Sequence, residues 1–325
     1  MPKEIRPNLY QIEIPLPETP LKRLNSYLIK GSKRHLLIDT GFNRRECKEA
    51  LLAALSALNT SPAECDYFIT HLHADHSGLV CELADQDSLV YSSREDGEGI
   101  LRFLNGDHWD IMGKLLVNHG FPLDILEETI HKHPASKGGI TRDLDLTFVE
   151  DGQMISVGDY ELRCIDTSGH TPGHFCLYEP YKKLLFSGDH VLGNITPNIT
   201  VWPNLQNALY KYLQNLDKIY ALDIDLTLPG HRKLIYNCQT RIDEIKAHHE
   251  KRLQELLGIL TQKPMSAYEA AANMTWDLSY KSWDDFPFPQ KWFATGEAAA
   301  HLEYLAHTGA AEKRLLQDVN IFSLA

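Results

Sequence analysis

The segment THLHADHSG, at positions 70 to 78, constrains this chain more than any other. Within six consecutive positions it places His71, His73, Asp75 and His76. A helix would scatter these side chains, because residues one or two apart do not share a helical face. The preceding CDYFIT has the apolar run of a buried strand. We therefore expect the cluster where a strand ends and a loop begins, a common place for a functional site in an α/β protein.

The bulk properties limit the kinds of partner. The chain has 325 residues, enough for one large domain or two ordinary ones, and a net charge of −12. An acidic surface repels phosphate backbones, so duplex DNA is not an expected partner. A small-molecule substrate is expected instead, and RNA stays open.

The cysteines and the hydropathy pattern bear on the compartment. No C-x-x-C pair occurs among the six cysteines, which favours reduced thiols over a disulfide framework. The N-terminus lacks the apolar region of a signal peptide, and no run of 18 apolar residues occurs. We expect a cytoplasmic protein without a membrane span.

Strand patterns and one distinct helical region divide the first half of the chain. Alternation predicts a strand over residues 9 to 14, and SYLIKG and RHLLIDTG predict a hairpin around a Gly-Ser turn. Residues 44 to 58 have helical spacing. Residues 93 to 139 hold short helical pieces broken by glycines, so we expect a helical insertion over one side of the fold.

The second half returns to strands and then changes character. Strand patterns run from 146 to 186, an amphipathic helix is expected over 205 to 220, and the strand DLTLPGH follows. We place the first domain at residues 1 to 238 and a second at 239 to 325.

The second domain should be mostly helical. A long helix is expected from a Thr240 cap to residue 260, another after Ser266, and a third over 296 to 309, ending at Gly309. The tail alternates weakly. Three helices and a short hairpin predict a winged-helix-like domain.

Four blocks rich in histidine and aspartate follow probable strands. They are THLHADH, GHTPGH, SGDH and PGH, at residues 70–76, 169–174, 187–190 and 229–231. A metal site needs imidazoles and carboxylates that converge from several strand ends. Seven such side chains suffice for two metals that share a carboxylate, an arrangement that hydrolyses esters and phosphodiesters. Nitrogen and oxygen ligands without thiolate suit Zn, Fe or Mn.

These blocks resemble the metallo-β-lactamase superfamily. THLHADH fits its H-x-H-x-D-H signature, the other three blocks follow in the family's order, and HLLIDTG matches its early strand and turn. The resemblance covers roughly residues 8 to 235. It implies an α/β fold, the αββα metallo-β-lactamase sandwich, followed here by the small C-terminal helical domain.

The resemblance also implies two divalent metal ions, with Zn expected and Fe or Mn compatible. The first ion would be held by His71, His73 and His170, the second by Asp75, His76 and His231, and Asp189 would bridge them together with a water or hydroxide. Asp75 and Asp189 would be the carboxylates important for catalysis. Asp39 would orient a ligand from behind, as ligands usually require, and His174 is also expected behind the site.

The remaining histidines are not assigned to metal. His190 follows the bridging aspartate, and a neighbour in a strand would point away. The insertion carries His108, His119, His131 and His133, and whether any of these five side chains touches substrate stays open.

Differences between this sequence and known branches of the superfamily reduce the number of expected functions. His73 replaces the glutamate of the flavodiiron oxygen reductases, and Asp189 stands where true β-lactamases carry cysteine or histidine. After Asp189 the sequence HVLGNITPNITVWP lacks the lysine and tyrosine with which glyoxalase II binds glutathione. The gap from Asp189 to His231 is too short for the domain inserted in β-CASP nucleases.

The C-terminal region resembles the winged-helix extension of the lactamase-like hydrolase branch, in which one member type is an endoribonuclease. From Thr240 onward the chain has 9 lysines and arginines against 12 aspartates and glutamates, a balance of −3. A winged helix that grips DNA would usually be basic. We expect this region to wall the active site or form a homodimer contact.

The function expected is metal-dependent hydrolysis of a small ester, thioester or related substrate by a hydroxide shared between two metals. Three alternatives stay open: an endoribonuclease on single-stranded RNA, a sulfur dioxygenase with one iron, and a metal-sensing regulatory protein. The acidic C-terminal region argues against the regulator, and the complete second set of ligands weakens the dioxygenase.

Overall fold

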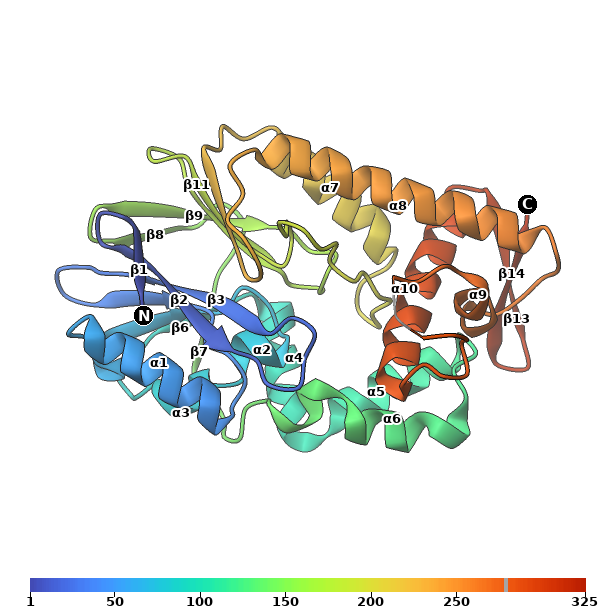
Figure 1. Ribbon diagram of the computed structural model, residues 1–325, viewed down its shortest axis with the longest axis horizontal. Helices are drawn as coiled ribbons and strands as arrows, with labels where there is room; N and C mark the ends of the chain where they lie inside the picture. The colour runs from blue at the N-terminus through green and yellow to red at the C-terminus, as the bar shows by residue number, and fades with distance from the viewer. Residues whose placement is uncertain (278–279) are drawn as a thin grey trace.

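Two β-sheets lie face to face between layers of helices (Figure 1), in a computed structural model that describes residues 1–277 and 280–325. The first sheet runs in sequence order: β1 (Lys3–Arg6), β2 (Leu9–Pro15), β3 (Arg23–Ile29), β4 (His35–Ile38), β5 (Cys65–Phe68), β6 (Val90–Ser92) and β7 (Leu146–Phe148). The second has the order β12 (Leu226–Pro229), β11 (Leu184–Gly188), β10 (Phe175–Glu179), β9 (Tyr160–Asp166) and β8 (Met154–Val157). The expected αββα sandwich is confirmed.

Strand direction explains where polar residues gather. The β4 and β5 strands pair in parallel, and so do β11 and β12. The carboxyl ends of parallel neighbours meet at one edge of a sheet, where binding sites of α/β proteins usually lie. Each of these four strands is followed directly by one of the segments that the sequence singled out.

The core between the sheets is apolar and is built by both. The largest side chains there include Tyr27 and Phe68 from the first sheet and Phe186 from the second. The Tyr27 and Phe186 rings meet edge to face with centroids 5.5 Å apart, a favourable aromatic arrangement. The Tyr27 hydroxyl donates to the carbonyl of Pro229, 2.8 Å away, and so ties β3 to the end of β12.

Helices cover the outer faces. They are α1 (Arg45–Ala57), which contacts β2, the short α2 (Ala74–Ser77) and α3 (Val80–Leu83), and α7 (Ala208–Tyr220). The α7 helix begins three residues later than its pattern predicts, because Asn207 takes a left-handed backbone, with φ of 51°, just before it. The prediction for α1 is confirmed almost to the residue.

The insertion is helical, as expected. It consists of α4 (Arg94–Asn105), α5 (Asp107–Val117) and α6 (Leu126–Lys132). Ser93 caps α4 by accepting a hydrogen bond from the Asp96 amide. Gly106, with φ of 76°, separates α4 from α5, a backbone that glycine adopts readily.

The C-terminal region contains the three helices and the hairpin that were expected: α8 (Cys238–Leu260), α9 (Ala267–Asn273), α10 (Phe288–His307), β13 (Ala311–Leu316) and β14 (Val319–Leu324). Two boundaries were predicted wrongly. Asn237, not Thr240, caps α8 and accepts from the Thr240 amide. The third helix starts at Phe288 rather than 296, since Pro287 and Pro289 are tolerated in a first turn.

The C-terminal region packs directly on the rest of the molecule. The α10 helix contacts α5, α6 and α7, and α8 lies along α7 (Figure 1). The boundary at residue 238 and the winged-helix character of the region stay predictions.

Within the described residues, no helix has the length and apolar character needed to cross a membrane. All six cysteines are buried free thiols.

Candidate metal centre

Seven side chains from separate strand ends converge at the edge of the sandwich. The segment after β5 carries His71, His73, Asp75 and His76. A loop had been expected here, but residues 74–77 form one helical turn. Asp75 and His76 lie in that turn, and His73 is its N-cap residue.

The first group consists of His71, His73 and His170. His73 Nδ1 lies 3.1 Å from Nε2 of His71 and 3.0 Å from Nε2 of His170. Three ring nitrogens this close, from segments about a hundred residues apart in sequence, form the kind of cluster that imidazole ligands make around a transition metal.

The second group consists of Asp75, His76 and His231. The Nε2 atoms of His76 and His231 are 3.2 Å apart. Asp75 Oδ2 lies 3.4 Å from His231 Nε2. The group therefore offers two nitrogens and one oxygen.

Asp189 lies between the two groups. Its Oδ1 atom is 3.5 Å from His76 Nε2 and 3.6 Å from His231 Nε2. Its Oδ2 atom is 3.8 Å from His170 Nε2 in the first group. Each carboxylate oxygen thus faces a different group. Oδ1 is buried and lacks a hydrogen-bond partner in the described part of the chain, as a metal ligand would in the absence of its ion.

Hydrogen bonds from behind fix which ring nitrogen faces inward. Nδ1 of His170 donates to the Asn198 carbonyl, 2.9 Å away, and Nδ1 of His231 donates to the Arg23 carbonyl, 2.8 Å away. A carbonyl can only accept, so in a neutral ring the inward Nε2 carries a lone pair and no proton. The donor set therefore fits metal ions.

The pKa values of the histidines are shifted in opposite directions in the two groups. Burial, followed by the neighbouring histidines, holds the pKa of His71 and His73 well below the usual range, so both rings are neutral. Burial would also lower the pKa of His76, but the carboxylates of Asp39 and Asp189 raise it to about 10. The second group is thus the more negative environment, which suits a cation.

Sequence similarity identifies the family of the chain. The family model of the metallo-beta-lactamase superfamily matches residues 21–231. The chain belongs to the metallo-β-lactamase superfamily.

The relatives have low sequence identity to this chain but align with most of its length. It is 26% identical over 297 residues to the probable metallo-hydrolase YqjP of Bacillus subtilis, covering 86% of each chain. It is 25% identical over 240 residues to the atrochrysone carboxyl ACP thioesterase of Aspergillus fumigatus, covering 74% of this chain and 60% of that protein. The crystal structure of the metallo-beta-lactamase family protein TTHA1429 from Thermus thermophilus superposes with a TM-score of 0.84 at 27% identity, covering 99% of this chain and all of that one. The protein is a hydrolase with the metallo-β-lactamase fold.

Asp39 lies behind the second group of candidate ligands. Its Oδ1 atom accepts from the Thr70 amide at 2.9 Å, and its Oδ2 atom lies 2.7 Å from Nδ1 of His76. Asp39 adopts a left-handed backbone, with φ of 58°, which aspartate tolerates better than most residues. It links the end of β4 to the ligand segment after β5.

His174 lies behind Asp189. Its Nε2 atom accepts from the Asp189 amide at 3.1 Å, and its Nδ1 atom lies 2.8 Å from the Thr167 hydroxyl. The His190 ring packs against Tyr212, with ring centroids 5.1 Å apart.

Asp96 is a buried residue that the sequence reasoning missed. Its carboxylate accepts hydrogen bonds from the Leu72 amide at 2.9 Å, the Gly173 amide at 2.8 Å and the Thr171 hydroxyl. It therefore joins the His71–His73 segment to the segment that carries His170. Burial raises the pKa of Asp96 to about 7 despite these donors. The sequence signal at this position was only that of a helix start, Ser93-x-x-Asp96.

The histidines of the insertion separate into different environments. His119 pairs with Glu303 of α10 at 3.2 Å and links the insertion to the C-terminal region. His131 is exposed. His108 and His133 lie among aromatic rings.

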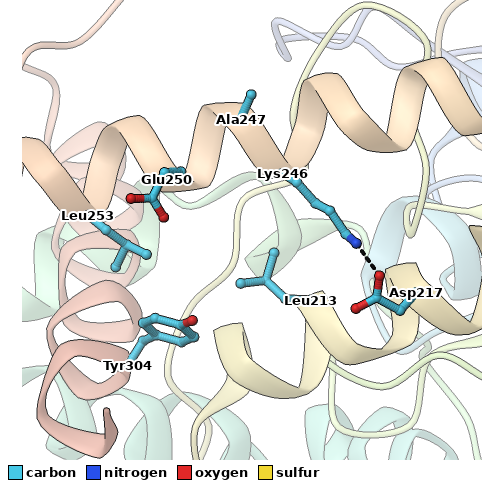
Figure 2. A pocket seen from close by; sticks show the side chains of 7 residues that line it. All are labelled: Leu213, Asp217, Lys246, Ala247, Glu250, Leu253 and Tyr304. Atoms are coloured by element: carbon cyan, nitrogen blue, oxygen red, sulfur yellow. Dashed lines mark hydrogen bonds and ion pairs between the residues drawn. The ribbon is translucent and has the colours of Figure 1, made fainter. Parts of the chain in front are cut away.

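A surface groove lies apart from the centre. It runs between α7, α8 and α10 (Figure 2), and its lining residues are Leu213, Asp217, Lys246, Ala247, Glu250, Leu253 and Tyr304. Lys246 and Asp217 form an ion pair across it. These seven residues include none of the predicted ligands.

Proposed function

We propose that this protein hydrolyses a small-molecule ester, thioester or related substrate with a dinuclear metal centre. The observation that carries the proposal is the position of Asp189, with one oxygen toward each group of ligands. A mononuclear site would need only one group, and a structural zinc site is usually a closed four-coordinate cage. Here His73 and Asp75 are partly exposed, so the centre is open on one side.

The seven ligands would hold two divalent ions, Zn in the first instance, with Fe or Mn compatible with the same donors. When bound, such a pair lowers the pKa of a shared water toward neutrality and polarises the group that the water attacks.

The chain's own residues support this chemistry by holding the ligands rigid. The Asn198 and Arg23 carbonyls orient His170 and His231, and Asp39 orients His76. Such outer hydrogen bonds raise ligand basicity and set ring orientation. His174 holds the backbone of Asp189 in place.

A thioester is the substrate class we favour. One relative is named as a thioesterase of acyl carrier protein, and it aligns with three quarters of this chain. The net charge of −12 does not favour RNA. We also propose a cytoplasmic location and a homodimer contact through the C-terminal region.

The experiment is a substrate panel run on protein of known metal content. Thioesters, aryl esters, lactones, bis(p-nitrophenyl) phosphate and single-stranded RNA are compared with and without added Zn or Mn. Metal-dependent turnover of a thioester or ester, at least about a hundredfold above that of RNA and the phosphodiester, is the expected result. Preferential cleavage of RNA, or oxygen consumption with a persulfide, would replace the proposal by one of the alternatives.

A further inference from the structure

An aromatic surface stands beside the metal centre, built from the insertion and the C-terminal region together. We call it the aromatic wall, and it consists of Phe103, His108, Trp109, His133, Trp292 and Phe293. The His133 ring lies 4.8 Å from that of Trp109 and 5.0 Å from that of Phe293. Phe103 stacks on His108 at 4.0 Å. Five of the six side chains are only partly buried, so their rings are not simply core.

Hydrogen bonds join the wall to a metal ligand. The side-chain amide of Asn198 donates to the Phe293 carbonyl at 3.4 Å, while the Asn198 carbonyl accepts from Nδ1 of His170. The wall is therefore one residue removed from the first group of ligands.

The wall lies beside the exposed part of the first group. His73 and Asp75 are the two partly exposed ligands among the seven. His73 Nδ1 lies 3.0 Å from Nε2 of His170, the ring that Asn198 connects to the wall. A substrate that binds at the exposed His73 is therefore expected to meet the wall.

The proton of the His133 ring can be assigned to one nitrogen. Its Nδ1 atom accepts from the Ala135 amide at 3.2 Å, so in the neutral ring Nε2 carries the proton. Nε2 has no hydrogen-bond partner within residues 1–277 and 280–325. Burial lowers the pKa of His133 to about 3, so the ring is neutral at physiological pH.

Ring geometry bears on what the wall can bind. Trp109 meets His133 at an interplanar angle of 60° and Trp292 at 63°. Angled pairs are a favourable packing of aromatic rings, and the five partly buried side chains leave part of the wall exposed. An added aromatic pair strengthens binding by about two- to twelvefold beyond the effect of its buried area, a gain that an alkyl group of equal size lacks.

We propose that the aromatic wall binds a planar aromatic acyl group and that His133 Nε2 donates a hydrogen bond to an oxygen substituent on its ring. This inference rests on the proposed hydrolysis of thioesters and adds the class of acid. His133 is then a residue that determines specificity, and the enzyme prefers aroyl thioesters to alkanoyl ones.

The first test compares three N-acetylcysteamine thioesters: benzoyl, cyclohexanecarbonyl and acetyl. Each kcat/KM is divided by the rate constant for hydroxide-catalysed hydrolysis of the same thioester, which removes intrinsic reactivity. The benzoyl compound should exceed the cyclohexanecarbonyl compound by about tenfold, the effect of one or two aromatic pairs. Equal values would mean that the wall is merely apolar and would overturn the proposal.

The second test replaces His133. His133→Phe keeps an aromatic ring and removes the donor, and it should lower kcat/KM for the 4-hydroxybenzoyl thioester by about tenfold, the scale of one neutral hydrogen bond. The acetyl thioester, which has no ring oxygen, should change less than about twofold. His131→Phe, an exposed position two residues earlier, is the matched control and should behave as wild type. An equal loss on both substrates would assign His133 a merely structural role.

A binding measurement separates this inference from the proposed function. Binding of 6-hydroxy-2-naphthoate is followed by quenching of tryptophan fluorescence, since Trp109 and Trp292 belong to the wall. Cyclohexanecarboxylate displacement and the variants His133→Phe and Phe293→Leu are measured alongside. Saturable naphthoate binding that both variants weaken supports the wall even if no thioester is hydrolysed. Thioester turnover with no naphthoate preference keeps the proposed function and rejects the wall.

Discussion

Oδ2 of Asp39 lies 2.7 Å from Nδ1 of His76, and both side chains are buried. The pair joins the end of β4 to the ligand segment after β5, 37 residues apart in sequence. It determines which nitrogen of His76 faces the second group of ligands.

Asp39→Asn should therefore weaken the second group. The amide places an N–H where His76 and Thr70 need an acceptor, so His76 loses its orientation. Loss of such a partner typically lowers metal affinity by about 10–100-fold. Titration with a chelator of known affinity measures it, and Asp225→Asn, at an exposed position beside β12, is the control. Unchanged affinity for both metal ions would show that Asp39 only connects the end of β4 to the segment after β5.

The variant Asp189→Asn tests whether Asp189 bridges the two groups of ligands. The change keeps the size and one oxygen but removes the charge that both groups share. The second group should lose its ion first, since the first retains three histidines. We expect a folded protein whose turnover falls by about a hundredfold or more, as when a main electrostatic element is removed. Turnover, metal content and melting temperature are measured on one sample. Near-normal turnover with both ions present would contradict the bridging role.

The number of metal ions is a separate prediction. Two complete groups of ligands should bind about two ions per chain, and elemental analysis of protein purified without chelator measures the number. Dialysis against a chelator should abolish turnover, and Zn or Mn should restore it. A single ion, with the second not recoverable, would favour the mononuclear dioxygenase.

Asp96 should contribute a pH dependence to stability. Burial raises its pKa in the folded state to about 7, whereas an unfolded aspartate has about 3.9. The folded state thus binds this proton more tightly, and the resulting stabilisation is complete below about pH 4 and lost as pH rises through about 7. As pH rises from about 5 to 8, the melting temperature of the wild type should fall relative to that of Asp96→Asn, whose side chain cannot titrate. Chelator-treated samples avoid the titration of bound metal, and a difference that stays constant with pH would refute the assignment.

Duplex DNA should bind weakly and without sequence preference. The net charge of −12 opposes phosphate contacts, and any binding that exists should fall steeply with salt. Fluorescence anisotropy at about 0.15 M salt measures it. Sub-micromolar affinity under that condition would move a regulatory or endoribonuclease function above small-molecule hydrolysis.

The sequence by itself determined the family, the order of strands and helices, and the seven candidate ligands. These were readable because H-x-H-x-D-H is a local pattern and because alternation and helical spacing report burial within one element. The helix start at Cys238 was missed by three residues and the start at Phe288 by eight, since caps and first-turn prolines act at single positions.

Tertiary structure alone decided how the ligands are held and what faces them. The carbonyls of Asn198 and Arg23, which orient His170 and His231, carry no residue-specific signal. Asp96 joins two ligand segments through backbone amides. The aromatic wall exists because α10 packs against the insertion from far along the chain. Such contacts depend on long-range packing, so local sequence patterns do not contain them.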